Sequence, residues 1–244
     1  VKGRLLNSFS MSEHEGDLRI ATTDDEAQES AVVVLRPQDG VLAEIGSVGG
    51  LGKTEQIYAV RFLGDRGYVV TFRQTDPLYV LDLADPSAPR VTGELKIPGY
   101  SAYLHPVGEH RLLGVGQDAT DQGRTQGTQV SLFDVSDPAA PKRLANATLP
   151  RSQSEAEYDH HAFLWWARSN LAVLPVSDWQ DGTTAAVGFR VGDDSVTEAG
   201  RVAQRDRQPI RRSVVVGDRL LTLSDSGLQT NDLASLTERG WLAY

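Results

Sequence analysis

The sequence contains no cysteine, and this absence excludes disulfide bridges as well as thiolate-bound zinc and iron–sulfur sites. It does not exclude secretion, because a chain of 244 residues can bury about three quarters of its unfolded surface without covalent bridges. A basic excess is also lacking, since 24 Lys and Arg stand against 33 Asp and Glu, for a net charge of −9. Nucleic acid is therefore not an expected partner, because binding to its phosphates depends on Lys and Arg.

Long apolar runs and helical periodicity are lacking as well. No stretch of 18 apolar residues occurs, so the sequence predicts no transmembrane segment. The chain starts at Val1 without an initiator Met or a signal region, which we interpret as a mature or excised fragment. No segment keeps a 3.6-residue apolar period over three turns, and the 11 Pro and 23 Gly fall mostly between short apolar segments. Together these features predict an all-β fold.

The sequence repeats itself. Segments 78–90 and 130–142 each consist of an alternating strand pattern that runs into Asp-Pro-x-x-Pro. Around this pair, the same order of four strands and three turns recurs five times, at intervals of about 50 residues. The predicted repeats are 1–50, 51–98, 99–150, 151–204 and 205–244.

Each repeat is expected to contain four short strands. The first strands are predicted over 7–14, 57–63, 101–107, 158–166 and 210–216. The second strands are predicted over 18–22, 68–72, 112–116, 171–176 and 220–223. The third strands are predicted over 31–35, 78–83, 130–135, 185–191 and 228–233. The fourth strands are predicted over 41–47, 90–97, 142–149, 196–203 and 238–244.

A four-strand unit that recurs five times favours a β-propeller. Short strands at regular spacing also occur in β-sandwiches, which remain the alternative architecture. In a propeller, however, each four-stranded antiparallel blade buries both faces against its neighbours, which suits the continuous apolar runs of the second strands. We predict one propeller domain over 1–244 with about five blades, or a fragment of a larger propeller.

Several segments carry a resemblance to a known family: 3–7 (Gly-Arg-Leu-Leu-Asn), 10–16 (Ser-Met-Ser-Glu-His-Glu-Gly), 18–23, 61–80, 103–106 (Tyr-Leu-His-Pro) and 158–164 (Tyr-Asp-His-His-Ala-Phe-Leu). Over essentially the whole chain, the sequence resembles bacterial secreted proteins with a C-terminal β-propeller domain distantly related to WD40 repeats. The Asp-Pro-x-x-Pro units also resemble propeller repeats of the LVIVD type. The resemblance implies a secreted or surface-anchored bacterial protein and no particular reaction.

Family members carry further repeats upstream of the Arg-Leu-Leu-Asn segment, and this sequence does not show them. Two arrangements follow from that difference. Either five blades close into a ring alone, or upstream blades or a second chain complete a larger ring.

The loops between second and third strands are acidic. They are 23–26, 74–76, 117–122, 177–182 and 224–227. In a propeller these loops share one rim, where their carboxylates concentrate negative potential. Asp118 and Asp178 are therefore candidate ligands for a hard cation such as Ca²⁺, although no segment has a complete twelve-residue calcium loop. The alternative is that these Asp residues only make turns.

The segment 154–166 is the densest cluster of titratable and aromatic residues. Its Glu155, Asp159 and His160 are candidate metal ligands, with His161 beside them. If the segment is an extended strand, adjacent side chains point to opposite faces, so the two imidazoles cannot converge on one ion. One of them could still act with a carboxylate and with His105 of the preceding blade. The alternative is a structural role, with Asp159 fixing a His tautomer or a turn.

First strands of a propeller line its central channel. Aligning them places Tyr58, His161 and Arg211 near the axis, where they would suit a small anionic or carbohydrate ligand. Trp179 in the acidic loop 177–182 is the best single candidate for stacking on a sugar, although the sequence favours packing against a neighbouring blade over this role.

Nucleophilic catalysis has little support, because no Gly-x-Ser-x-Gly motif and no cysteine occur. We therefore predict a non-catalytic, extracellular propeller that presents a loop-rich face for a protein or carbohydrate ligand, with calcium as a possible cofactor. The competing hypothesis is a propeller hydrolase or a metal-dependent enzyme that uses the region of Asp159, His160 and His161.

Overall fold

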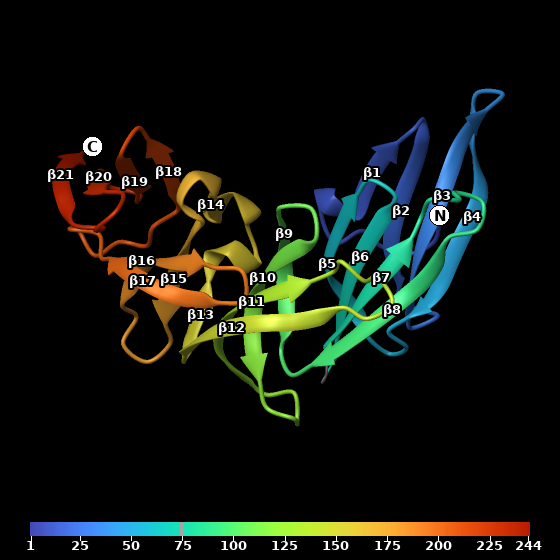
Figure 1. Ribbon diagram of the computed structural model, residues 1–244, viewed down its shortest axis with the longest axis horizontal. Helices are drawn as coiled ribbons and strands as arrows, with labels where there is room; N and C mark the ends of the chain where they lie inside the picture. The colour runs from blue at the N-terminus through green and yellow to red at the C-terminus, as the bar shows by residue number, and fades with distance from the viewer. Residues whose placement is uncertain (74–75) are drawn as a thin grey trace. The chain divides into compact units, whose positions relative to one another are not determined.

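The computed structural model describes residues 1–73 and 76–244, and these residues form β-strands joined by turns and short 3₁₀ helices (Figure 1). The first sheet contains β1 (Met11–His14), β2 (Asp17–Asp24), β3 (Glu29–Gln38) and β4 (Val41–Leu51). The second contains β5 (Gln56–Leu63), β6 (Arg66–Phe72), β7 (Asp76–Asp82) and β8 (Arg90–Ile97). The third contains β9 (Tyr100–Val107), β10 (Arg111–Ala119), β11 (Thr125–Asp134) and β12 (Lys142–Pro150).

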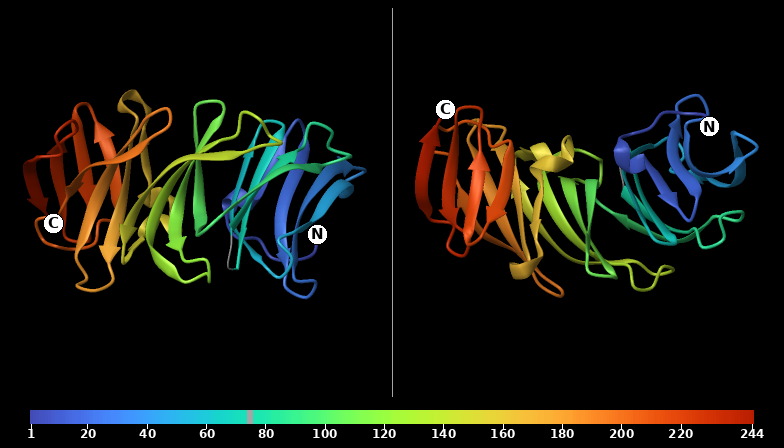
Figure 2. Two further views of the ribbon diagram at one scale, coloured as in Figure 1. Left: turned by 60° about the horizontal axis from the view of Figure 1, so that its bottom comes forward. Right: turned by 90° about the horizontal axis from the view of Figure 1, so that it is seen from above.

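The fourth sheet contains β13 (Ser152–Ser154), β14 (Leu164–Trp166), β15 (Leu171–Asp178), β16 (Thr184–Val191) and β17 (Val196–Val202). The fifth contains β18 (Arg212–Val216), β19 (Arg219–Leu223), β20 (Gly227–Asp232) and β21 (Glu238–Ala243). Within each sheet the strands lie in sequence order as antiparallel neighbours, except that β13 and β14 both pair with β15 (Figure 2). The predicted all-β class and the four-strand unit are thus confirmed.

The chain forms two compact units. Unit one comprises Val1–Leu112, Ala119–Thr125 and Phe133–Lys142, and unit two comprises Leu113–Asp118, Gln126–Leu132 and Arg143–Tyr244. Unit one has an apolar core around Tyr68, Leu104 and Phe133. The core of unit two gathers around Leu171, Ile210 and Leu220.

The second strands of the second, third and fourth blades are buried on both faces, as their continuous apolar sequences predict. In β6 the six residues after Arg66 are all buried, and in β15 the six residues from Leu171 to Val176 are all buried. A strand that is covered on both sides needs apolar residues at consecutive positions and not only at alternate ones. In the first and fifth blades, β2 and β19 instead alternate at least in part between buried and partly exposed residues.

The prediction of one continuous strand over 158–166 is wrong. The first strand of the fourth blade is split into β13 and β14, both paired with β15, and two short 3₁₀ helices lie between them. Ser154 caps the first of these helices, η2 (Glu155–Glu157), and Asp159 caps the second, η3 (His160–Ala162). Ser and Asp side chains that accept backbone N–H bonds locally compete with strand pairing, and here they prevail.

The prediction over 7–14 fails in the same way at its start. Asn7 accepts a hydrogen bond from the backbone N–H of Phe9 at 2.9 Å and caps η1 (Ser8–Ser10). The strand β1 therefore begins only at Met11.

Turns between third and fourth strands pack on the fourth strand of the preceding blade. In unit one, a Cβ added to Gly46 of β4 would overlap the Pro86 carbonyl oxygen, and a Cβ on Gly93 of β8 would overlap that of Pro138. Both prolines belong to Asp-Pro-x-x-Pro turns. In the first of these turns, Asp85 accepts a hydrogen bond from the backbone N–H of Ser87 at 2.9 Å. These motifs therefore act structurally, as predicted.

Candidate functional site

A groove of about 310 Å³ lies on the fourth blade of unit two. Strands β12, β13, β15, β16 and β17 supply its walls, and Leu149, Val176 and Val187 form its apolar part. Its polar lining comes from Ser152, Asp178, Thr183, Thr184 and Arg201. A hollow that combines an apolar floor with a few polar groups is the usual form of a small-ligand site.

Trp179 directly follows Asp178 of that lining, at the start of the turn between β15 and β16. Its backbone N–H donates to the Arg151 carbonyl oxygen at 2.8 Å, and the Gln180 N–H donates to the Asp178 carboxylate at 2.7 Å. The turn is thus held by its backbone, while Trp179 stays 46% exposed. At this exposure Trp179 is not completely packed against a neighbouring blade.

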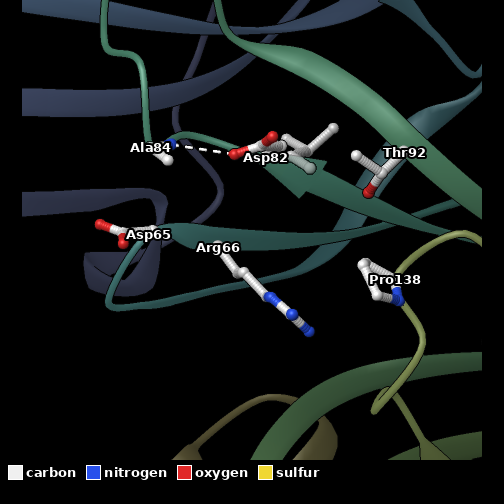
Figure 3. A pocket seen from close by; sticks show the side chains of 7 residues that line it. Asp65, Arg66, Asp82, Ala84, Thr92 and Pro138 are labelled. Carbon is white, nitrogen blue, oxygen red and sulfur yellow. Dashed lines mark hydrogen bonds between the residues drawn. The ribbon is translucent and has the colours of Figure 1, made fainter.

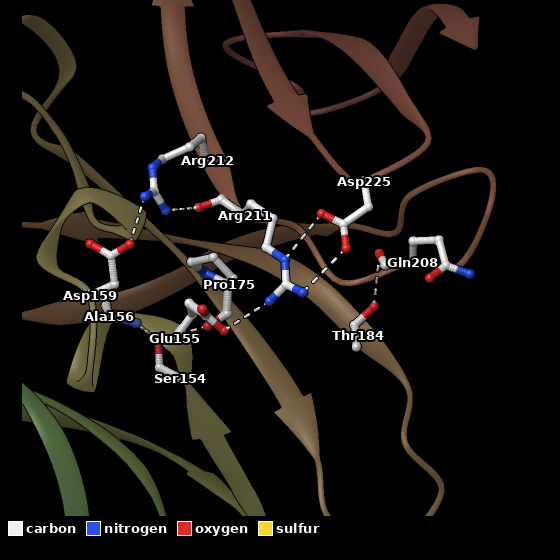
Figure 4. A network of polar contacts seen from close by, with 10 residues as sticks. All are labelled: Ser154, Glu155, Ala156, Asp159, Pro175, Thr184, Gln208, Arg211, Arg212 and Asp225. Atoms are coloured by element: carbon white, nitrogen blue, oxygen red, sulfur yellow. Dashed lines mark hydrogen bonds and ion pairs between the residues drawn. The ribbon is translucent and has the colours of Figure 1, made fainter. Parts of the chain in front are cut away.

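An ion-pair network joins the fourth blade to the fifth (Figure 4). Arg211 lies between two carboxylates, with Nη1 3.5 Å from Glu155 Oε2 and Nη2 3.2 Å from Asp225 Oδ2. The adjacent Arg212 pairs with Asp159, Nη2 to Oδ2, at 2.6 Å. Asp225 raises the pKa of Arg211, so this guanidinium stays charged. The predicted ligand residue Arg211 is therefore already bound to carboxylates of the protein.

His160 and His161 lie against each other in the 3₁₀ helix η3. Their ring centroids are 3.9 Å apart, and His161 Nδ1 lies 2.9 Å from Asp159 Oδ1. The expectation that the two imidazoles must point to opposite faces is wrong, because it assumed an extended strand. Hydrogen bonds from the ring and the backbone N–H of His161, and to a smaller extent the contact with Arg212, lower the pKa of Asp159 to about 2.

Asp159, His160 and His161 each offer a ligand atom, and these atoms lie within 4.8 Å of one another. Two imidazoles and one carboxylate are a donor set for zinc or a similar transition metal, whereas Ca²⁺ prefers oxygen ligands only. Within the described part of the chain, Glu155, Asp118 and Asp178 do not belong to this group. Asp118 instead accepts a hydrogen bond from Gln126 Nε2 at 3.3 Å.

The other two predicted ligand residues, Tyr58 and His105, belong to unit one. Tyr58 packs against Tyr100 and Phe72, with ring centroids 4.6 and 5.5 Å away, and thus lies beside the core. His105 Nδ1 lies 3.0 Å from the Tyr103 hydroxyl. Burial, reinforced by the nearby Arg61, lowers the pKa of His105 to about 4, so this imidazole is neutral at pH 7.

Arg61 contacts several residues around His105, although no sequence motif marks it as a candidate site residue. Its guanidinium lies 3.8 Å from the centroid of the Phe9 ring and 5.3 Å from that of Tyr103. Nε and Nη2 also donate to the Leu104 carbonyl oxygen at 2.9 and 2.6 Å. The cluster is built from segments far apart in sequence, so no local pattern could reveal it.

Glu157 and Gln117 form a second polar pair, in unit two, that was missed. Gln117 Nε2 donates to Glu157 Oε1 at 2.6 Å, and the same oxygen accepts the Ser154 N–H at 2.8 Å. Burial raises the pKa of Glu157. The spacing of Ser154 and Glu157 is that of a capping box, a signal that was readable in the sequence.

A further hollow of about 260 Å³ lies in unit one and is lined by Asp65, Arg66, Asp82, Thr92 and Pro138, among others (Figure 3). Its charged groups are engaged within the protein. Arg66 donates to the Val135 carbonyl oxygen at 2.9 Å, and Asp82 accepts from the Ala84 N–H at 3.0 Å and pairs with Arg90. In the acidic loop 74–76, Gln74 and Thr75 lie outside the described residues.

A family model described as beta propeller domain matches residues 1–236. The chain belongs to the beta propeller domain family. An uncharacterized protein of Methanocaldococcus jannaschii is 38% identical over 99% of this chain and 36% of its own length. An uncharacterized protein of Archaeoglobus fulgidus is 46% identical over 72% of this chain and 27% of its own length. The chain thus spans about a third of the length of these curated relatives.

Solved structures show the same fold. A prolyl endopeptidase structure aligns with a TM-score of 0.56 at 12% identity, covering 98% of this chain and 34% of its own. A eukaryotic initiation factor structure aligns with a TM-score of 0.54 at 9% identity, covering 98% of this chain and 55% of its own. Likeness at such low identity concerns the fold alone.

Two finer expectations are not supported by these comparisons. Both relatives are archaeal, so they do not confirm the bacterial origin that the resemblance implied, and neither comparison confirms the WD40 or LVIVD relation. Among the described residues, no helix has the length and apolar character needed to cross a membrane.

Proposed function

We propose that the protein is a non-catalytic, extracellular propeller whose groove on the fourth blade binds a carbohydrate chain. The observation that carries this proposal is the exposed Trp179, which begins the turn beside a groove of about 310 Å³ with hydroxyl and carboxylate groups in its lining. A sugar ring has an apolar face that stacks on an indole, and hydroxyls at its edge that bond to Thr, Ser and Asp side chains.

Preorganisation supports this assignment. Two backbone hydrogen bonds fix the turn that carries Trp179, namely its own bond to Arg151 and that of Asp178 N–H to the Thr183 carbonyl oxygen at 2.9 Å. Thr184 at the groove also donates to the Gln208 carbonyl oxygen at 3.3 Å. A ligand surface that is ordered before binding loses little conformational entropy when the ligand arrives.

The proposed extracellular location and the proposed completion of the propeller ring are supported by other observations. The extracellular location follows from the resemblance of the sequence to secreted propeller proteins. We further propose that 1–244 is one propeller domain or part of one, and that blades outside it, or a second chain, complete the ring. The relatives, which extend well beyond the matched region, are consistent with additional repeats.

An array of immobilised oligosaccharides tests carbohydrate binding. The wild-type protein should retain a subset of the glycans, and Trp179→Ala should weaken that retention at least ~10-fold, as loss of a central aromatic contact does. Tyr244→Ala is the matched control, because Tyr244 is an aromatic residue of the same unit that is 72% exposed. The proposal fails if no glycan binds, or if both variants lose binding equally.

The cluster of Asp159, His160 and His161 favours a second candidate, a metal-dependent enzyme. Both Asp159 oxygens already accept hydrogen bonds, Oδ1 from His161 and Oδ2 from Arg212. A metal ion would have to replace the ring contact of His161. Calorimetric titration with Zn²⁺ and with Ca²⁺ decides this candidate: saturation near one equivalent of Zn²⁺ that is lost in His160→Gln supports it, and no heat from either ion removes it.

A further inference from the structure

Four fourth strands share one backbone irregularity next to a glycine. In β4, for example, Gly46 pairs with Val34 of the third strand, and Glu44 pairs with Leu35, the residue after Val34. The strands β8, β17 and β21 show the same shift at their glycines. One residue is therefore left over as a β-bulge in each strand. The glycines are Gly46, Gly93, Gly200 and Gly240, and the extra residues are Ile45, Thr92, Ala199 and Arg239.

At three of these positions the glycine makes room for the next blade. The turn of the second blade covers Gly46 through Pro86, and the turn of the third covers Gly93 through Pro138. In unit two, the Leu236 side chain of the fifth blade lies 3.2 Å from where a Cβ on Gly200 would be, and the φ of +148° at Gly200 also favours glycine. The bulge and its glycine are thus a receptor for the turn between the third and fourth strands of the following blade.

The fourth strand of the third blade differs from the other four. Strand β12 of the third blade has no glycine. The turn of the blade that follows it is short, with the Gly192 N–H donating to the Ser195 carbonyl oxygen at 2.8 Å, and it contains no proline. At Gly46, Gly93 and Gly200, the turn of the following blade carries a Pro-x-x-Pro motif or a leucine.

Gly240 lies beside the same kind of bulge, but no turn of another blade covers it among the described residues. A Cβ added to Gly240 would meet only the Thr230 hydroxyl of the same blade, at 3.2 Å. The φ angles of Gly93 and Gly240 are not in the left-handed region, so the backbone itself does not demand glycine at either position. Two positions after Gly240, Leu242 is 61% exposed. The close Thr230 hydroxyl is one physical reason for this glycine, and space for a docking turn is a second.

We infer that β21 is a docking edge for a further blade of the same repeat, whose long turn between its third and fourth strands packs on Gly240. This inference rests on the proposal above that blades outside 1–244 complete the ring. The first blade of this chain does not offer such a turn. Its third and fourth strands pair up to Gln38 and Val41 and are joined by Asp39 and Gly40, both at positive φ, which is a tight two-residue turn. The relatives of this chain are about three times its length and have ample sequence for another blade.

Appending a blade to the chain tests this inference. Residues 52–98, a second copy of the second blade, would follow Tyr244 and so reproduce the connection by which β5 follows β4. If the copied Pro86 turn docks on Gly240, the melting temperature should rise by about 5 °C, and the fluorescence of the neighbouring Trp241 should shift. In the extended chain, Gly240→Ala should remove both effects, as the overlap at Gly93 predicts.

Two controls use the chain without the extra blade. Gly240→Ala should change its melting temperature by less than about 1 °C, whereas Gly93→Ala should lower it by about 5 °C, because only the second glycine is covered. Three results would each overturn the inference. They are no gain in the extended chain, an equal gain with Gly240→Ala, or a loss in the unextended Gly240→Ala chain as large as that of Gly93→Ala.

Discussion

Arg61 in unit one and Arg211 in unit two show two different uses of an arginine. Arg61 donates twice to one backbone carbonyl oxygen and lies on the Phe9 ring, and its burial lowers the pKa of the guanidinium. Arg211 is 43% exposed, and its carboxylate partners raise its pKa. The buried arginine therefore holds strands together, whereas the exposed one belongs to a solvated network of ion pairs.

This contrast also separates the predicted ligand residues. His105 and Tyr58 lie in the buried aromatic surroundings of unit one, and Trp179 lies beside an open groove of unit two. Residues of the first kind contribute to stability through packing, and residues of the second kind contribute little to it. Stability measurements can therefore test the comparison without any ligand.

The largest effect is expected for Arg61→Ala. The substitution leaves the buried Leu104 carbonyl oxygen without its donor and removes the packing on Phe9, which should cost about 3 kcal/mol of the free energy of unfolding. Urea unfolding measures this loss. Arg61→Lys should recover part of it, and an Ala variant as stable as the wild type would contradict the buried role.

The second effect is a pH dependence that involves His105. Its pKa of about 4 in the fold lies below 6.5 in the unfolded chain, so the unfolded chain takes up the proton first as the pH falls. Stability should be complete above pH 6.5, decline between pH 6.5 and 4, and level off below. Urea unfolding across this range should show a smaller decline for His105→Gln, and an unchanged decline would refute the assignment.

A smaller effect is expected for Arg211→Ala. Its two ion pairs are exposed to solvent and screened, so their loss should cost less than about 1 kcal/mol. The same urea measurement, repeated at high salt, provides the check, since the difference from wild type should shrink there. A cost equal to that of Arg61→Ala would abolish the distinction between the two arginines.

The smallest effect is expected for Asp159→Asn. The folded-state pKa of about 2 lies below the usual value of 3.8, so the carboxylate stabilises the fold above pH 4 and loses this contribution as the pH falls towards 2. Asparagine should therefore reduce stability slightly at pH 7 and not at pH 2. Equal deficits at both pH values would mean that the charge of Asp159 does not matter.

The repeats and most of the strands were predictable from sequence because their signals are local. Continuous apolar runs such as Leu171–Val176 mark strands that are buried on both faces, and the Asp-Pro-x-x-Pro motifs mark the turns between them. The segment 154–166 escaped prediction because caps at Ser154 and Asp159 outweigh strand propensity there. The Arg61 cluster escaped because the Leu104 carbonyl that it binds lies 43 residues away in sequence.

The candidate site was predictable only in part. An exposed Trp in a polar loop is visible in the sequence, but the groove beside it requires five strands to come together. The two imidazoles of His160 and His161 are in contact because they lie in the 3₁₀ helix η3. The sequence predicts a β-strand there, in which adjacent side chains would point to opposite faces. The relative orientation of side chains that are close in sequence is thus predictable only when the secondary structure of their segment has been predicted correctly.

One measurement compares the two regions most directly, namely the affinity of a glycan selected on the array for Trp179→Ala and for His105→Gln, each measured against wild type. If ligand binding resides in the groove of unit two, Trp179→Ala loses at least ~10-fold in affinity and His105→Gln retains the wild-type value. Loss of affinity in His105→Gln with full retention in Trp179→Ala would place binding in unit one and contradict the account.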